Sequence, residues 1–448
     1  MLSFLLLLSV PSFVPPLEKA VVYEANLRAE GPTGGFAQLT QRLDAIQALG
    51  VNVLWLMPVQ PVGKLRSAGG LGSPYATADY DRVNPEFGTV SDLKRLIAEA
   101  HNRRIAVILD WVANHTAWDN PWVKAHPDWY THDAKGEIAI PAGTNWQDAA
   151  DLNYDNTALR SAMIASMKGW VERFGIDGFR FDTADWVPVD FWKEAVPALR
   201  KASPKPLFLL GEGFRKENSQ AGFDLEYGWP FYDELVKIYR GGKASSLAAA
   251  AAKEKANGLA HLRFVTSHDK SAWEGTPFDY FKTSAGVQTA TLVTALYGGG
   301  VPLIYSGQEV GWSKRIPFFD RSTIDWAGHS EIGRWLGDLS RLREANQVFQ
   351  TGDTEDLSND DAIVFLRRKG SEEAVVFANV RDRAVSVPVP SEQRGSWMDG
   401  MTQRKVDLLD SIEIPAYGSR VLLRKSDRNV VGQRKDLFNL AKSGLSSS

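Results

Sequence analysis

The 448-residue chain contains no cysteine, which excludes disulfides, a thiol nucleophile and a thiolate metal site. It also lacks a strong charge of either sign. The formal net charge is −3 and no basic tract stands out, so we expect no nucleic-acid partner. The seven histidines show neither H-x-H nor H-x-x-x-H spacing, which argues against a catalytic zinc site.

Long apolar runs are also missing, apart from one at the N-terminus. Residues 1–14 are apolar but too short to span a bilayer, and no later segment is apolar enough to do so. We interpret residues 1–16 as a signal-like segment and expect a secreted or periplasmic protein without a membrane partner. Basic residues before the run and a clear cleavage site are absent. An uncleaved anchor, or an apolar N-terminus on a cytoplasmic protein, is therefore an alternative.

The composition is that of a globular protein, with 44% hydrophobic and 23% charged residues. The length leaves room for one large domain and one or two small ones. Aromatic residues are abundant, with 15 Trp, 21 Phe and 12 Tyr. They suit a large core or a cleft that stacks on flat ligand surfaces, and we expect most of them in the core.

Strand and helix patterns alternate from about residue 20 to residue 345, which predicts a (β/α)8 TIM barrel formed by residues 17–115 and 157–345. The predicted strands are 20–25, 51–57, 105–110, 176–182, 207–212, 222–227, 262–269 and 301–305. The predicted helices are 36–49, 90–102, 157–174, 191–200, 245–256, 283–296 and 331–345.

Two further regions interrupt or follow this alternation. Residues 116–156, rich in Trp, Pro, Asp and Asn, form a predicted insertion (domain B) after the third strand, over the active face of the barrel. Short β-rich runs with turns between them predict a C-terminal antiparallel β-sandwich at 346–425. The polar tail 426–448 is expected to be loose.

Four predicted strands end on a carboxylate: Asp110, Asp182, Glu212 and Asp269. A buried acid is costly, so four in succession indicate that strand ends aim carboxylates at one point. Arg180 lies two residues before Asp182 and therefore shares its face of the strand, where it suits an ionised partner. Glu212 follows Leu-Leu-Gly, an apolar approach that favours the protonated form. One ionised and one protonated carboxyl group are what glycoside cleavage needs.

On these residues the chain resembles the α-amylase family of retaining glycoside hydrolases (glycoside hydrolase family 13). The resemblance covers about residues 20–425, and it is specific because many short motifs occur in order on the expected strands. The motifs are Asp110-Trp-Val-Ala-Asn114-His115, Gly178-Phe-Arg180-Phe-Asp182, Gly211-Glu212, Phe264-Val-Thr-Ser-His268-Asp269, Gly50-Val-Asn-Val-Leu-Trp-Leu-Met-Pro58, Ser73-Pro-Tyr75, Asp151-Leu-Asn153 and Gly300-Val-Pro-Leu-Ile-Tyr-Ser-Gly-Gln-Glu309.

The resemblance implies catalytic roles for three acids. Asp182 would attack the anomeric carbon and form a β-linked glycosyl-enzyme. Glu212 would protonate the leaving oxygen and then deprotonate water. Asp269 would hold sugar hydroxyls and distort the ring.

The resemblance also implies a substrate-binding shell. Arg180 would keep Asp182 ionised, His115 and His268 would hydrogen-bond the sugar, Tyr75 would stack on it, and Asp110 would support the shell. The family often has Lys-His shortly after the nucleophile, whereas this chain has Asp185-Trp186. Trp186 could stack on the leaving-side sugar, but the departure leaves the bond specificity open.

Calcium is the one cofactor that the resemblance suggests, and no organic cofactor is expected. Asn114 and Asp151 match family positions that often bind a calcium ion between barrel and insertion. Calcium prefers several oxygen ligands from loops, and no Asp-x-Asp-x-Asp loop is present. The alternative is that both residues only hydrogen-bond the insertion.

The sequence therefore predicts a monomeric α-amylase-type hydrolase whose partner is an α-1,4-glucan or maltooligosaccharide. An α-glucosidase, an exo-acting maltooligosaccharide-forming enzyme and a transglycosylase share these catalytic residues and stay open. A rival from another class is a non-catalytic glucan-binding relative. Such relatives usually lose one of the three acids, and all three are present here.

Overall fold

The structure is a computed structural model that describes residues 13–31, 35–328 and 330–425. Most of the signal-like segment 1–16 and the whole tail 426–448 lie outside this range, so the predictions of export and of a loose tail stay predictions. Among the described residues, no helix is both long and apolar enough to cross a bilayer.

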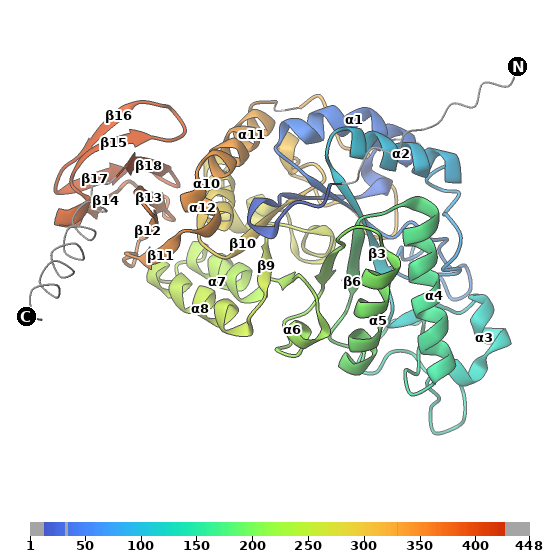
Figure 1. Cartoon of the computed structure of the whole chain (residues 1–448). Coiled ribbons are helices and arrows are strands. Elements are labelled where there is room, and N and C mark those ends of the chain that lie inside the picture. The colour runs from blue at the N-terminus through green and yellow to red at the C-terminus, as the bar shows by residue number, and fades with distance from the viewer. Residues whose placement is uncertain (1–12, 32–34, 329, 426–448) are drawn as a thin grey trace, which may run out of the picture.

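Eight parallel strands close into a barrel, which confirms the predicted fold (Figure 1). Around the ring their order is β1-β10-β9-β8-β7-β6-β3-β2. The strands are β1 (Val22–Ala25), β2 (Val53–Leu56), β3 (Ala106–Val112), β6 (Gly178–Asp182), β7 (Phe208–Gly211), β8 (Leu225–Tyr227), β9 (Ala260–Arg263) and β10 (Gly300–Tyr305).

Helices pack around the outside of this barrel (Figure 1). The longer ones are α1 (Phe36–Ala48), α2 (Val90–Asn102), α4 (Thr157–Phe174), α5 (Val189–Ala202), α7 (Trp229–Tyr239), α8 (Leu247–Asn257), α10 (Ser284–Leu296) and α11 (Ser330–Ala345). Local sequence sets their ends. Thr89 and Asp92 form a capping box that begins α2, and Gly175 ends α4 in the left-handed conformation, φ 66°.

Three sequence predictions need correction. The seventh strand is β9 (Ala260–Arg263) rather than 262–269, so Asp269 lies in the loop that follows the strand and not at its end. The sixth strand begins at Leu225 rather than at residue 222, because Gly222 is left-handed (φ 88°) and ends the short helix α6 (Asn218–Ala221). Helix α7, which has Pro230 in its first turn, was not predicted.

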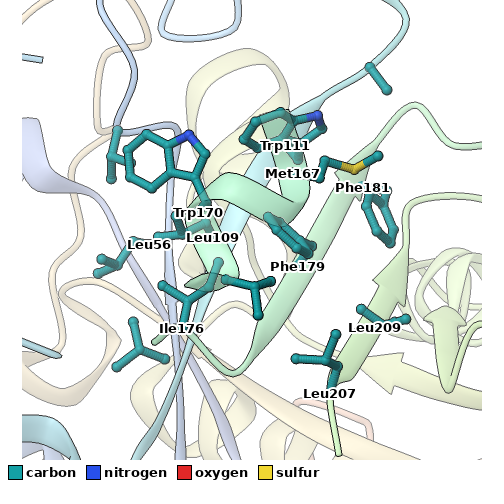
Figure 2. Close-up of a cluster of buried hydrophobic side chains, with 14 of the residues drawn as sticks. Leu56, Leu109, Trp111, Met167, Trp170, Ile176, Phe179, Phe181, Leu207 and Leu209 are labelled. Atoms are coloured by element: carbon teal, nitrogen blue, oxygen red, sulfur yellow. The ribbon is translucent and has the colours of Figure 1, made fainter. Parts of the chain in front are cut away.

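Strand β6 shows how alternation positions the site. Phe179 and Phe181 point outward and join the cluster between barrel and α4, with Met167 and Trp170 from that helix (Figure 2). Arg180 and Asp182 therefore point to the opposite side, the barrel interior. A Cβ on Gly178 would lie 1.9 Å from the carbonyl oxygen of Phe208, so only glycine lets β6 approach β7 this closely.

The predicted insertion follows β3. It contains β4 (His115–Ala117) paired with β5 (Ala149–Asp151), and the short helix α3 (Pro121–Ala125). Its pairing register places His115 opposite Asp151, so the insertion begins and ends beside the barrel mouth.

The C-terminal region is a pair of antiparallel sheets, as predicted. One sheet has the order β11-β12-β13-β18-β15-β16 and the other pairs β14 with β17. A shared apolar cluster lies between them, including Val364 and Phe377 from the large sheet and Val387 and Ile414 from the small one. The strands are β11 (Asp353–Asp356), β12 (Ala362–Lys369), β13 (Glu372–Asn379), β14 (Val385–Pro388), β15 (Gly395–Asp399), β16 (Lys405–Leu408), β17 (Ser411–Ile414) and β18 (Ser419–Lys425). The helix α12 (Gln347–Thr351) links this region to α11.

Candidate active site

The carboxyl ends of the barrel strands open into a cavity of about 900 Å³. Loops that follow several different strands line it, and the insertion contributes residues 145–149. Among the predicted site residues, the cavity is lined by Asp182, Glu212, Asp269, Tyr75, His115, His268 and Trp186. Arg180 and Asp110 lie beneath them, fully buried.

Arg180 is the electrostatic centre of this site. Its Nη1 donates to Oδ1 of Asp110 at 2.9 Å and to Oδ1 of Asp182 at 2.8 Å. Its Nη2 lies 2.8 Å from Oε2 of Glu212, close enough for an ion pair although poorly aligned for a hydrogen bond. One buried guanidinium therefore contacts three carboxyl groups, which lie on β3, on β6 and directly after β7, three neighbouring strands.

Glu212 follows β7 and is held by the loop after β6. The backbone N–H of Thr183 donates to its Oε2 at 2.7 Å. Burial raises the pKa of Glu212 to about 8, and the charges of Asp182 and Asp269 act in the same direction, against the lowering by Arg180. A carboxyl group with this pKa keeps its proton near neutral pH, as a general acid requires.

His268 lies between two acidic side chains, Glu24 and Asp269. Its Nδ1 hydrogen-bonds Glu24 of β1, and its Nε2 lies 3.4 Å from Oδ2 of Asp269. Burial lowers the pKa of His268, but the carboxylates of Asp269 and Glu24 outweigh that effect and raise it to about 9. His268 is therefore a cation at neutral pH, with Asp269 held beside it.

Tyr75 lies over the cavity floor and is fixed by hydrogen bonds. Its hydroxyl donates to Oδ2 of Asp110 at 3.0 Å and lies 2.8 Å from Nε2 of His268. Asp110 also accepts from the indole N–H of Trp55 at 3.1 Å. The ring of Tyr75 stacks on those of His268 (centroids 5.2 Å apart) and Phe318 (5.6 Å).

On the insertion side, His115 contacts Trp146, with ring centroids 5.4 Å apart. Trp146 in turn stacks on Trp186 at 5.1 Å and 19°. Trp186 is half exposed at the edge of the cavity, with one face covered by Trp146. Burial lowers the pKa of His115, which leaves its imidazole neutral near pH 7.

Several residues of the site were not found by sequence reasoning. Glu24 lies inside an apolar strand and meets His268 only through the closure of the barrel. Thr183 contributes a backbone N–H, which leaves no trace in the sequence, and its φ of 41° is unusual for a β-branched residue.

Asp185 is the third such residue. Its carboxylate accepts from the N–H of Phe214 and from the amide of Asn218, both at 2.8 Å. A Cβ on Gly213 would lie 2.1 Å from Oδ1 of Asp185. The loops after β6 and β7 therefore pack as one unit around Glu212.

The two predicted calcium ligands lie at the junction of barrel and insertion. The carbonyl of Asn114 accepts from the N–H of Leu152 at 3.2 Å, which places Asn114 beside the segment that carries Asp151. Burial raises the pKa of Asp151. Within the described ranges, no three His, Cys, Asp or Glu side chains gather into a metal-binding group.

A parallel barrel whose strand ends present two acidic side chains across one arginine, one of them with a raised pKa, has the arrangement of a glycoside hydrolase. Residues 24–360 match the family model described as "Alpha amylase, catalytic domain". The chain therefore belongs to the α-amylase family of glycosidases.

Relatives of known activity differ among themselves. The chain is 26% identical to α-amylase MalA of Haloarcula japonica over 426 residues, covering 87% of this chain and 61% of MalA. It is also 26% identical to a cyclomaltodextrin glucanotransferase of Niallia circulans over 412 residues, covering 79% of this chain but 55% of that protein. The chain thus spans less than two thirds of these relatives.

Among solved structures, the crystal structure of an α-amylase from Lactobacillus plantarum superposes with a TM-score of 0.81 and 26% identity. The match covers 91% of this chain and 99% of that one.

Proposed function

We propose that this protein is an α-amylase-type hydrolase that cleaves α-1,4-glucosidic bonds of starch and maltooligosaccharides with retention of configuration. The observation that carries the proposal is the contact of one buried guanidinium, Arg180, with both Asp182 and Glu212. The two carboxyl groups therefore face one guanidinium from neighbouring strands, and a retaining enzyme needs such a pair about 5–5.5 Å apart.

In the first step, Asp182 attacks the anomeric carbon as the bond to the leaving oxygen breaks. Arg180 stabilises the carboxylate form of Asp182 before attack. Glu212 is protonated because its pKa is raised to about 8, and it gives its proton to the leaving oxygen. The products are a glycosyl-enzyme ester and a free oligosaccharide hydroxyl.

In the second step, Glu212 is a carboxylate and takes a proton from water, which attacks the anomeric carbon and releases Asp182. Two inversions leave the α configuration unchanged. Cationic His268 and the carboxylate of Asp269 face the cavity together, where they can hydrogen-bond sugar hydroxyls and hold a distorted ring.

The cavity walls suit a chain of glucose units. Tyr75 offers a ring beside the reacting carboxylates, and Trp186 offers a half-exposed ring at the edge of the cavity. Aromatic faces stack on the apolar faces of sugars, while the charged floor binds hydroxyls.

The test is a time course of products from soluble starch and maltoheptaose, with Asp182→Asn as the inactive control. The proposal predicts short α-linked oligosaccharides from both substrates and none from the control. Products longer than maltoheptaose would show that the protein is a transglycosylase rather than a hydrolase. Absence of turnover by a folded protein would contradict α-1,4-glucan as the substrate.

A calcium ion at Asn114 and Asp151 is a separate part of the proposal. An amide and a carboxylate oxygen are the ligands that calcium prefers, and main-chain carbonyls and water would complete its six to eight ligands. A cation here would tie the insertion to the barrel, and no step of the reaction uses it. Calcium should raise the melting temperature of the chelator-treated protein but not that of Asp151→Asn. Equal responses of the two proteins would contradict this site.

A further inference from the structure

Residues 63–72, which we call the rim, follow β2 and line the cavity through Arg66, Ser67 and Ala68. One end of the rim is fixed to the insertion. The backbone N–H groups of Lys64 and Leu65 donate to Oδ2 of Asp119 at 2.7 and 3.3 Å. The guanidinium of Arg66 lies 3.8 Å from the ring centroid of Trp118.

The other end of the rim is fixed to the loop after β10. The N–H of Leu71 donates to the carbonyl of Phe319 at 2.8 Å. A Cβ on Gly69 would lie 2.4 Å from Cβ of Phe319, so a larger residue could not pack here. Beneath this contact, the buried guanidinium of Arg28 donates to the carbonyls of Gly72 (2.7 Å) and Phe318 (3.4 Å) and so joins both loops.

Aromatic rings extend the same wall toward the loop after β9. Trp273 contacts Phe318 and Phe319, with centroids 5.1 and 5.6 Å apart, and all three line the cavity. The N–H of Ile316 donates to Oγ of Ser271 at 3.0 Å. The insertion and the loops after β2, β10 and β9 therefore form one continuous band.

The position of this band follows from the strand order. β1 lies between β2 and β10, and it is four strands from β7 in either direction around the ring. The band thus stands opposite Glu212, which follows β7. Because Glu212 protonates the leaving oxygen, the leaving chain lies on its side. The glycone, the part that becomes bonded to Asp182, extends toward the band.

We propose that the rim and the Phe318–Phe319–Trp273 wall close the glycone side of the cleft, so that the enzyme cuts from the non-reducing end of its substrate and releases a short product. This inference rests on the proposed α-glucan hydrolysis and deepens it. A polymer that crossed the site would need an opening on both sides of the carboxylates. Phe318 stacks on Tyr75 and lines the cavity, so the wall stands directly beside the cleavage point on the glycone side.

The test compares p-nitrophenyl α-maltoheptaoside with its analogue blocked at the non-reducing end by a 4,6-ethylidene group, each followed by chromatography. The full chain should consume the free substrate at least about 100-fold faster than the blocked one. Equal consumption would overturn the closed glycone side and leave α-glucan hydrolysis intact. Consumption of neither would overturn the proposed hydrolysis, and the inference with it.

A variant of the wall tests whether this wall causes the difference between the free and the blocked substrate. Phe319→Ala should open the band and increase turnover of the blocked substrate by about tenfold or more. Leu409→Ala, in the C-terminal region and 71% exposed, is the matched control and should behave as wild type. A folded Phe319→Ala protein without that gain would contradict the role of this wall. If this variant does not fold, the comparison of the two substrates on the wild-type protein still decides.

Discussion

At the scale of the residue, the site depends on the contacts that Arg180 makes with three carboxyl groups. Asp110 and Asp182 accept its aligned hydrogen bonds, whereas Glu212 has only an unaligned contact and a single backbone donor, Thr183. Burial therefore dominates at Glu212 and raises its pKa. Burial also raises the pKa of Asp110, to about 6, although Arg180 is aligned with it, so burial sets the direction of both shifts.

The raised pKa of Glu212 predicts the pH dependence of catalysis. The acid acts only when protonated, so kcat/KM on maltoheptaose should fall as the pH rises through about 8. A pH profile measures this. With α-maltosyl fluoride, whose leaving group needs no proton, that decline should be largely absent. The same decline with both substrates would contradict Glu212 as the acid.

Removing the nucleophile tests Asp182 directly. Asp182→Asn should lower kcat by at least about a thousandfold, because no covalent intermediate can form. The fold should persist, since Arg180 still pairs with Asp110. Steady-state assays and circular dichroism measure the two effects. Asp190→Asn, on the exposed surface of α5, should be unaffected, and wild-type turnover by Asp182→Asn would refute the assignment.

At the scale of the element, the loops after β6 and β7 behave as one part. Asp185→Ala removes acceptors for the Phe214 N–H and the Asn218 amide, so Glu212 should be less well positioned. We expect kcat to fall by about tenfold or more. Asp185→Asn keeps an acceptor for one of these bonds and should restore most of the activity. If kinetic assays find both variants equally impaired, charge rather than hydrogen bonding is responsible.

The strands of the barrel and the contacts between distant segments differ in how well the sequence predicts them. The barrel was predictable because buried parallel strands are short apolar runs, and acids at their ends, such as Asp182, stand out. Contacts that form only when the barrel closes were not predictable from the sequence. Glu24 and His268 are 244 residues apart, and the partner of Leu71 in the rim is a backbone carbonyl, at Phe319. Such contacts depend on geometry that no local pattern encodes.

At the scale of the whole molecule, the C-terminal sheets pack directly against the barrel through hydrogen bonds and a shared apolar cluster. Arg367 donates to the carbonyl of Leu296 at 2.7 Å, and Thr289 donates to that of Tyr417 at 2.6 Å. Apolar side chains of β12 and β13 share one core cluster with the barrel helices. We therefore expect both regions to unfold together.

Arg381 tests this docking. It donates to the carbonyls of Ile238 (3.0 Å) and Gly242 (2.6 Å), at the end of α7. Arg381→Ala should lower the free energy of unfolding by about 1–3 kcal/mol, because both carbonyls lose their donor. Arg383→Ala removes only an exposed pair with Asp361 and should cost less than about 1 kcal/mol. Urea unfolding measures both, and equal losses would contradict a stabilising junction.

In the proposed mechanism, Asp182 and Glu212 cleave an α-glucosidic bond with retention. The most direct measurement is the anomeric configuration of the first product from maltoheptaose, followed by proton NMR before mutarotation. Retention predicts that the α anomer appears first. Initial formation of the β anomer would contradict it, because a single displacement would then have occurred and Asp182 could not be the nucleophile.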